Sequence, residues 1–478
     1  MNALEYYLAI DQGGHASRAM VFDQNANIIC QSEYSIETQT PKPGWVEHDP
    51  EQLIEATFRA IQSCLQTLGA DKKRVKAAGL ATQRSSIVCW NRDSGAALSA
   101  VVSWQDRRQA EWLKQFQGHN ETIHRKTGLF LSPHYGASKI RWCLDTIAAV
   151  KQAQKNGHLA IGPLASFLAF RLLRQRPMLA DPANASRTLL WNIATQDWDE
   201  DLLRLFGIDK AILPPCHSSR NNFGQLNIDG SNIPMTVMTG DQSAALFAWG
   251  TPTPQSIYIN MGTGAFVQRP LDEYQSSHRM LTSLVYQDET YHCYSREGSV
   301  NGAARALQWF AEKFAIAEIE KQVTDCLSTA VTPPLFINTV AGLGSPDWQA
   351  QIEPQFIGEG DSNSKLLAVI ESIVFLIQRN LDAMAGTNHT ANNIIISGGL
   401  ATLDGLSQLI ADLSGLDVLR PQEHEASATG LAYLIAARPK NWPALQQVKT
   451  FTPDKNLPLK QRYQQWSTAL DKIIADIT

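Results

Sequence analysis

The pattern of apolar and polar positions predicts short strands and then a helix at the start of the chain. Apolar runs at residues 6–10, 17–22 and 28–36 are short and bounded by turn residues, as strands are. The first run ends in a glycine-rich turn, Asp11-Gln-Gly-Gly-His15, with a carboxylate at its entrance. Asp49 before Pro50 predicts a helix start, and apolar residues spaced three and four apart continue that helix to Leu68.

The rest of the first half alternates between short strands and helices. Strands are predicted at 75–81, 86–90, 101–104 and 235–238. One helix is predicted to open at Asp106, and a second covers 198–205 with Asp197 as its cap. This alternation is typical of an α/β protein.

The same plan begins again in the second half. Strands are predicted at 256–261, 266–269, 280–286, 290–295 and 393–397, and helices at 300–314, 365–385, 403–413 and 426–437. The segment from Arg438 onward is polar and contains proline, so we expect a surface tail with one terminal helix.

Each half carries a glycine-rich turn directly after its first strand. The turn at 11–14 corresponds in position to the turn at 260–264, and a further pair, Gly398-Gly399, follows a buried strand. Turns of this kind can present backbone N–H groups to phosphate oxygens. Each alone could be an ordinary tight turn, but the three together predict two α/β lobes that face each other across a nucleotide-binding cleft.

The stretch from Thr236 to Phe247 carries the candidate chemistry. A β-type run stops at Gly240, and Asp241 and Gln242 precede a helix start of small residues. A carboxylate between a strand end and a helix start points into the crevice on which the strand ends open. We therefore interpret Asp241 as the general base of a kinase; the alternative is that it only caps the following helix.

Composition narrows the class of protein. The chain has 478 residues, 44% of them hydrophobic and 18% charged, as an ordinary globular protein of several domains would have. Its net charge of −5 argues against non-specific nucleic-acid binding. The seven cysteines are scattered and form no Cys-x-x-Cys pair, which indicates reduced thiols and no zinc site. No signal peptide or membrane span is apparent, so we expect a cytoplasmic protein without a membrane partner.

Several motifs are recognisable at this point, and together they resemble the FGGY family of carbohydrate kinases, most of all its glycerol kinases. The resemblance runs from about residue 6 to about residue 437. The motifs are Pro41-Lys-Pro-Gly-Trp-Val-Glu-His-Asp-Pro50, Asn184-Ala-Ser-Arg-Thr-Leu-Leu-Trp-Asn192, Asp197-Trp-Asp199, Gly240-Asp-Gln-Ser-Ala-Ala-Leu-Phe247 and, more sparsely, Glu297-Gly298, Gln308-Trp309 and Gly398-Gly399.

The resemblance implies a fold and a reaction. The fold is α/β, the two-lobed actin-like ATPase (ribonuclease H-like) fold with a central cleft, and we place the lobes at residues 1–247 and 248–478. The reaction is transfer of the ATP γ-phosphate to a hydroxyl of a sugar or polyol, with Mg²⁺. The partners are thus a small sugar or polyol and ATP or ADP, and the sequence leaves a homodimer open.

The resemblance also carries site residues onto this sequence. Asp241 matches the catalytic base, and Asp11 and Asp241 match the carboxylates beside the metal. Pocket positions for the acceptor, with polar partners for hydroxyls and rings for the C–H face, are Arg84, Ser85, Trp104, His134, Asp241, Gln242 and Phe266. Positions that would bind the nucleotide are Gly13, Gly14, His15, Ser17, Arg18, Gly262, Thr263, Gly264, Gly398, Gly399 and Leu400.

The chain departs from the family pattern close to the chemistry. The first turn carries Gly14 and His15 where glycerol kinases have two threonines, and Ser85 stands where they have a glutamate. His134 replaces a tyrosine of the acceptor pocket, and Leu403 replaces an asparagine of the nucleotide site. Losing a hydrogen-bonding group built for a hydroxyl changes which substrate binds best. Two hypotheses follow: a kinase with an altered acceptor pocket, or a pseudokinase that binds nucleotide or sugar and acts by interaction.

Overall fold

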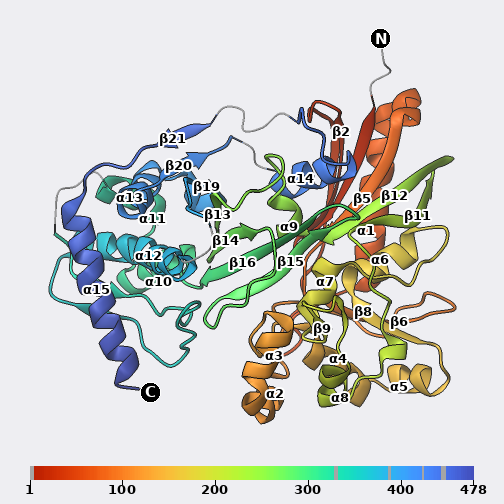
Figure 1. Cartoon of the computed structure of the whole chain (residues 1–478), viewed down its shortest axis with the longest axis horizontal. Coiled ribbons are helices and arrows are strands. Elements are labelled where there is room, and N and C mark those ends of the chain that lie inside the picture. Colours follow the sequence, from red (N-terminus) through yellow and green to blue (C-terminus); the bar gives the residue numbers. More distant parts are fainter. Residues whose placement is uncertain (1–4, 328–331, 386–388, 423–424, 443–447, 478) are drawn as a thin grey trace.

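Two lobes, each built on a mixed β-sheet, make up the computed structural model of the chain (Figure 1). The structure describes residues 5–327, 332–385, 389–422, 425–442 and 448–477. The arrangement confirms the predicted two-lobed α/β architecture. In Figure 1 the first sheet lies on the right, the second on the left, and α9 (Asp241–Ala245) and α14 (Ala426–Ile435) lie between them.

The first sheet brings three parallel strands to a common edge. The order of its strands is β11 (Arg220–Ile228), β12 (Ser231–Gly240), β5 (Val75–Thr82), β1 (Tyr6–Gln12), β2 (Ala16–Asp23) and β3 (Ile28–Ser35). β1, β5 and β12 run parallel, and Gln12, Thr82 and Gly240 stand side by side in register. The residues that follow or end these strands therefore emerge together, as expected at the carboxyl edge of a parallel sheet.

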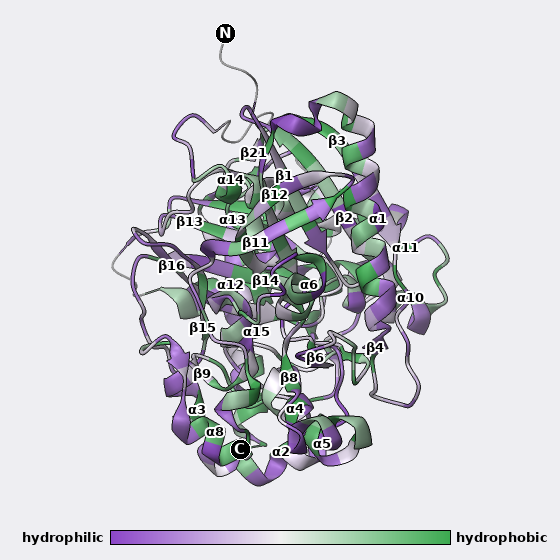
Figure 2. Cartoon of the chain, turned by 90° about the vertical axis from the view of Figure 1, so that its right-hand side faces the viewer, coloured by the Kyte–Doolittle hydropathy of each residue, from purple (hydrophilic) through white to green (hydrophobic). Residues whose placement is uncertain are grey.

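Helices cover both faces of this sheet. Side chains alternate between the faces of a strand, so Leu8 and Ile10 join the core under α1 (Pro50–Leu68), whereas Ala9 joins the core under α14. The Asp49 carboxylate accepts hydrogen bonds from the first amides of α1, which confirms the predicted cap. Figure 2 shows hydrophilic and hydrophobic residues mixed along α1, because only one of its faces is buried.

The helix α14 comes from the second half of the chain but packs on the first sheet. It contacts β1 and β5. A Cβ on Gly79 would lie 2.8 Å from the Ile435 side chain, so glycine allows the helix this close approach. A Cβ on Gly430 would lie 1.8 Å from the carbonyl oxygen of Ala244, which makes α14 and α9 a tightly packed pair between the lobes.

A smaller α/β region completes the first lobe at the lower right of Figure 1. Its sheet has the order β4 (Glu47–His48), β7 (Val101–Val102), β6 (Ile87–Asn91) and β8 (Leu159–Pro163). A two-stranded sheet of β9 (Trp191–Asn192) and β10 (Asp197–Trp198) adjoins it. The helices are α2 (Ala110–Leu113), α3 (Asn120–Thr127), α4 (Gly136–Thr146), α5 (Ala148–Lys155), α6 (Leu164–Leu172), α7 (Pro182–Ala185) and α8 (Glu200–Phe206).

Two predicted helix starts in this region are wrong. No helix opens at Asp106, because its carboxylate holds the turn by accepting hydrogen bonds from Arg108 and from the amide of Val46. Asp197 does not cap α8, because it pairs in β10; the cap is Asp199, whose carboxylate accepts from the amides of Asp201 and Leu202.

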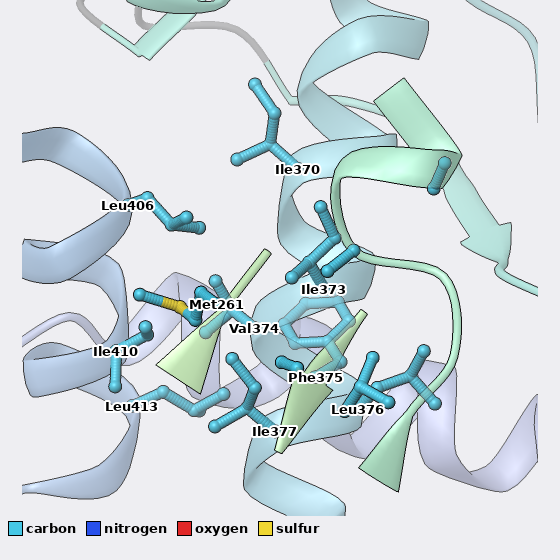
Figure 3. Close-up of a cluster of buried hydrophobic side chains, with 14 of the residues drawn as sticks. Met261, Ile370, Ile373, Val374, Phe375, Leu376, Ile377, Leu406, Ile410 and Leu413 are labelled. Atoms are coloured by element: carbon cyan, nitrogen blue, oxygen red, sulfur yellow. The ribbon is translucent and has the colours of Figure 1, made fainter. Parts of the chain in front are cut away.

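The second sheet has seven strands and a large apolar core on one face. The order is β15 (Leu281–Gln287), β16 (His292–Val300), β14 (Ala265–Leu271), β13 (Ser256–Met261), β19 (Asn393–Ser397), β20 (Asp417–Arg420) and β21 (Lys449–Phe451). Figure 3 shows the core, where α12 (Ser362–Met384) packs side chains such as Val374 and Ile377 near Leu406 and Ile410 of α13 (Asp404–Ser414) and Met261. Two further helices, α10 (Ala304–Phe314) and α11 (Ile319–Leu327), and the pair β17 (Leu335–Ile337) and β18 (Gln355–Ile357) lie on this side.

Two predictions for the second half need correction. The predicted helix at 300–314 begins only at Ala304, because β16 continues to Val300. The C-terminal segment is not a mere surface tail, because β21 pairs with β20, and α15 (Leu457–Ala475) buries Trp466 completely. The indole of Trp466 donates a hydrogen bond of 2.8 Å to the carbonyl of Phe336.

In the part of the chain that the structure describes, every helix is too short or too polar to cross a membrane.

Candidate active site

A cavity of about 200 Å³ lies between the two lobes, directly at the carboxyl edge of the first sheet. The first lobe contributes Asp11, Arg18, Asp241 and Gln242 to its lining. The face of the second sheet that points away from the core in Figure 3 contributes Tyr258, Asn260, Phe266, Gln268, Ile395 and Ser397. Five predicted site residues thus share one cavity: Asp11, Arg18, Asp241, Gln242 and Phe266.

Asp241 is held at the start of α9 by backbone and by a neighbouring arginine. Its Oδ1 accepts a hydrogen bond of 2.7 Å from the amide of Gln242. A Cβ on Gly240 would lie 2.5 Å from Cγ of Arg84, so only glycine lets the Arg84 stem pass beside the carboxylate. Burial raises the pKa of Asp241, and Arg84 and the Gln242 amide offset part of that rise. A carboxylate poised in this way suits a general base.

Asp11 is the second carboxylate of the cavity and lacks a full set of partners. It is 5% exposed, its Oδ1 has no hydrogen-bond partner among the described residues, and Arg18 Nη1 lies 3.8 Å from its Oδ2. Burial and the charge of Asp241 raise the pKa of Asp11 to about 7, although Arg18 lowers it. Two carboxylates with a free buried oxygen fit the oxygen ligands that Mg²⁺ prefers.

This electrostatic conflict predicts that Asp11→Asn stabilises the protein. Folding raises the pKa of Asp11, so the free energy of unfolding falls as pH rises from about 4 to about 7. At pH 8 without Mg²⁺, the variant should exceed the wild type by roughly 2–4 kcal/mol in unfolding free energy, and this gain should vanish near pH 4. Denaturant unfolding at both pH values measures it. The exposed control Asp71→Asn should change stability by less than about 0.5 kcal/mol, and a destabilised Asp11→Asn variant would contradict the expectation.

A second group of predicted residues lies beside the cavity and is joined to it by Arg84. Arg84 Nη2 donates a hydrogen bond to Oε1 of Gln242, which lines the cavity. The rings of Trp104 and His134 pack edge to face with centroids 5.4 Å apart. Ser85 has a left-handed backbone, with φ of +67°, and its buried Oγ has no hydrogen-bond partner among the described residues. A buried hydroxyl without a partner and a pair of aromatic rings together suit a small hydroxylated acceptor.

Two charged residues of this group were not predicted as site residues. Glu297 on β16 accepts a hydrogen bond from Arg187 Nη2 and lies 3.5 Å from Arg84 Nη1, so a second-lobe carboxylate joins two first-lobe arginines. Burial alone would raise the pKa of Glu297, but Arg187 and Arg84 hold it below its usual value. Glu297 and Arg187 both lie in motifs that carried the family resemblance, and that was the available signal.

Lys139 is the other unpredicted cation near this group. It lies on α4 and is 1% exposed. Its ammonium donates hydrogen bonds to the backbone carbonyls of Ser85 at 2.9 Å and of His134 at 2.5 Å.

The predicted nucleotide turns of the second lobe stand together at the other end of the cavity. Ser397, which lines the cavity, directly precedes the turn at 398–399, and Asn260, which also lines it, stands two residues before the turn at 262–264. A Cβ on Gly398 would lie 2.4 Å from the carbonyl oxygen of Met261, so this glycine lets the two turns meet. The carbonyls of Gly262 and Thr263 accept hydrogen bonds from the start of α10, and Leu400 and Leu403 pack against the second-lobe core.

Only some of the nucleotide-binding residues predicted in and after the first-lobe turn face the cleft. His15 is exposed, and Gly13 and Gly14 are half-buried. Arg18 lines the cavity near Asp11, Glu33 and Glu425. Ser17, in contrast, is fully buried, and its Oγ accepts a hydrogen bond of 3.1 Å from Thr57 Oγ1 on α1. Neighbouring residues of a strand point to opposite faces, so Ser17 faces the helix while Arg18 faces the cleft.

Comparisons with known proteins agree with this geometry. The N-terminal domain of the FGGY family of carbohydrate kinases matches residues 6–248, and the C-terminal domain of that family matches residues 257–438. The glycerol kinase of Shewanella frigidimarina is 32% identical over 493 residues and covers 98% of both chains. That of Rhodopirellula baltica is 32% identical over 488 residues, with 97% of this chain and 90% of the relative covered.

Solved structures show the same fold at lower identity. A Plasmodium falciparum glycerol kinase with ADP has a TM-score of 0.89 at 24% identity over 98% of each chain. A gluconate kinase from Lactobacillus acidophilus has a TM-score of 0.86 at 20% identity over 99% of each chain.

The family matches, together with the fold, define the class of the protein: an ATP-dependent phosphotransferase with an alcohol group as acceptor, on the two-lobed actin-like ATPase fold. The full-length matches define it more narrowly. This chain belongs to the FGGY family of carbohydrate kinases, and within it is similar to glycerol kinases.

Proposed function

We propose that this kinase phosphorylates a hydroxyl of a small polyol or sugar in the pocket around Arg84, with Asp241 as the base. The observation that carries the proposal is the Arg84–Gln242 hydrogen bond, because it joins the group around Trp104 and His134 to the cavity that contains Asp241. An acceptor bound there would have its hydroxyl beside the carboxylate and the γ-phosphate of ATP on the far side, toward the glycine-rich turns.

Each residue would have a distinct task in this reaction. Asp241 would accept the proton of the attacking hydroxyl as the new P–O bond forms. Arg84 and Gln242 would donate to acceptor oxygens and fix which hydroxyl faces the base. Trp104, His134 and Phe266 would cover the C–H face of the acceptor and exclude water, which otherwise competes as the phosphoryl acceptor.

The nucleotide would occupy the cleft between the first-lobe turn and the turns at 262–264 and 398–399. Backbone N–H groups of these turns, with Arg18, would bind phosphate oxygens. Asp11 and Asp241 would hold Mg²⁺, which supplies charge neutralisation on the phosphates when bound. The free buried Oδ1 of Asp11 supports this assignment.

The altered positions bear on which acceptor is used. Ser85 offers a hydroxyl where glycerol kinases have a carboxylate, and burial together with nearby Lys139, Arg187 and Arg84 lowers the pKa of His134 well below its usual value. A neutral imidazole can both donate and accept a hydrogen bond. We therefore place the acceptor among small polyols and ketoses, with glycerol as the first compound to test.

The test is Mg²⁺-dependent ADP release from ATP over a panel of polyols, ketoses and sugar acids. We expect at least one compound to raise ADP release far above the level of the Asp241→Asn variant. A panel on which the wild type and that variant behave alike, despite normal Mg-ATP binding by calorimetry, would favour the pseudokinase instead.

We also propose that the protein works in the cytoplasm, supported by its seven free cysteines, six of which are buried.

A further inference from the structure

Lys139 lies beneath the acceptor pocket and touches both of its altered positions. Ser85 and Lys139 are 54 residues apart in the chain, and the segment that leads into α4 brings the His134 carbonyl to the same ammonium. We propose that Lys139 is a positioning residue, which fixes the Ser85 and His134 segments against each other and thereby sets the acceptor pocket. This inference rests on the proposed function, because it assigns the pocket of the same kinase.

A side chain that only filled space in the core would not need an ammonium group. An ammonium is costly to bury unless its donors are satisfied, and an apolar side chain of similar length would pack without that cost. Both hydrogen bonds from Lys139 Nζ go to backbone carbonyls rather than to a carboxylate. The ammonium thus acts as a clamp between two chain segments.

The clamped segments carry pocket groups that need fixing. Ser85 has a left-handed φ of +67°, a conformation that costs energy for a residue other than glycine. The bond from Lys139 to the Ser85 carbonyl holds that conformation, which in turn sets the direction of the neighbouring Arg84 side chain. The bond to the His134 carbonyl holds the imidazole against Trp104. Releasing either carbonyl would loosen one wall of the pocket.

The charges around Lys139 make the clamp sensitive to pH. Burial and the charge of Arg108 lower the pKa of Lys139 and Asp106 raises it, and together they bring it to about 7. Asp106 and Arg108 are paired with each other, and His134 on the pocket side stays neutral. A protonated lysine donates stronger hydrogen bonds than a neutral one, so the clamp should be firmest below pH 7.

The test is Lys139→Met, with Lys151→Met on the exposed part of α5 as the matched control. We expect the acceptor KM to rise about tenfold at pH 6, with kcat within about threefold and the ATP KM unchanged, as for the loss of fixed hydrogen bonds. The effect on acceptor KM should shrink as pH rises through 7, and Lys151→Met should match the wild type throughout.

A second readout does not depend on activity. Because folding lowers the pKa of Lys139, the unfolded chain binds an extra proton between about pH 7 and 10, and wild-type stability rises with pH there. As pH increases from 7 to 10, the denaturant midpoint of the wild type should therefore rise relative to that of Lys139→Met.

The outcomes separate the two proposals. If no acceptor supports turnover by the wild type, the proposed function fails, whatever the midpoints show. If the wild type turns over but Lys139→Met lowers only kcat, or raises KM equally at pH 6 and pH 8, Lys139 has a merely structural role and this inference is overturned.

Discussion

Replacing Asp241 by asparagine is expected to lower kcat by roughly 10²–10⁴-fold, the usual contribution of a positioned general base. Asparagine keeps the shape of the side chain and can still accept the hydrogen bond from the Gln242 amide, but it cannot take the proton of an attacking hydroxyl. The fold should survive, because the substitution removes a buried carboxylate whose pKa burial already raises. Steady-state kinetics on the best acceptor of the panel measures kcat, and nucleotide binding by calorimetry shows whether the variant is folded.

The matched control is Asp201→Asn. Asp201 also stands in the first turn of a helix, α8, but its side chain is exposed and pairs with Lys126. Its replacement should leave kcat and nucleotide binding unchanged. If Asp241→Asn retained more than about a tenth of the wild-type kcat, an effect far below that of a lost general base, Asp241 would be only a helix cap.

The location of Asp11 and Asp241 could be predicted from the sequence because it follows from strand direction. Both lie at the ends of strands that read as apolar runs, and strands that run parallel place their carboxyl ends at one edge. In the structure, Gln12 pairs with Thr82, and Thr82 pairs with Gly240, as expected for three parallel strands. Local pattern and one rule of sheet geometry therefore sufficed for the carboxylates.

Two errors arose where a periodicity in the sequence was overlooked. Ser17 and Arg18 are neighbours in a strand and cannot both face the cleft, so the period of two already excluded one of them. In the C-terminal segment, Leu459, Tyr463, Trp466 and Leu470 recur at spacings of four, three and four, which is the stripe of a packed helix. The polar residues between them concealed it.

The contacts of Lys139 and Glu297 could not be predicted, because no local signal encodes them. The Ser85 carbonyl that Lys139 binds belongs to a turn 54 residues away, and Glu297 is 110 residues from Arg187. Such pairs depend on how the lobes and the smaller α/β region pack. A buried charge indicates that a partner exists, but it does not identify that partner.

Glu297 is the residue whose loss should disturb both the pocket and the fold. It holds Arg84 and Arg187 together although both guanidinium groups are buried. Glu297→Gln would leave two neighbouring cations without their ion-pair partner, with the more distant charge of Asp241 as the remaining counter-charge. Removing one partner of a buried ion pair costs roughly 3–5 kcal/mol, so the denaturant midpoint should fall sharply. The acceptor KM should rise about tenfold or more, because Arg84 loses one of the groups that aim it.

A double variant separates the structural from the functional part of this effect. In Arg187→Met/Glu297→Gln the unpaired cation of Arg187 is gone, so we expect much of the lost stability to return, as when a buried ion pair is replaced by apolar groups. The acceptor KM should stay high, because Arg84 still lacks its anchor from the second lobe. Glu312→Gln, on the exposed face of α10, is the control and should change neither quantity. If the double variant recovered the acceptor KM together with its stability, Glu297 would only neutralise charge, and the second lobe would have no part in aiming Arg84 at the acceptor.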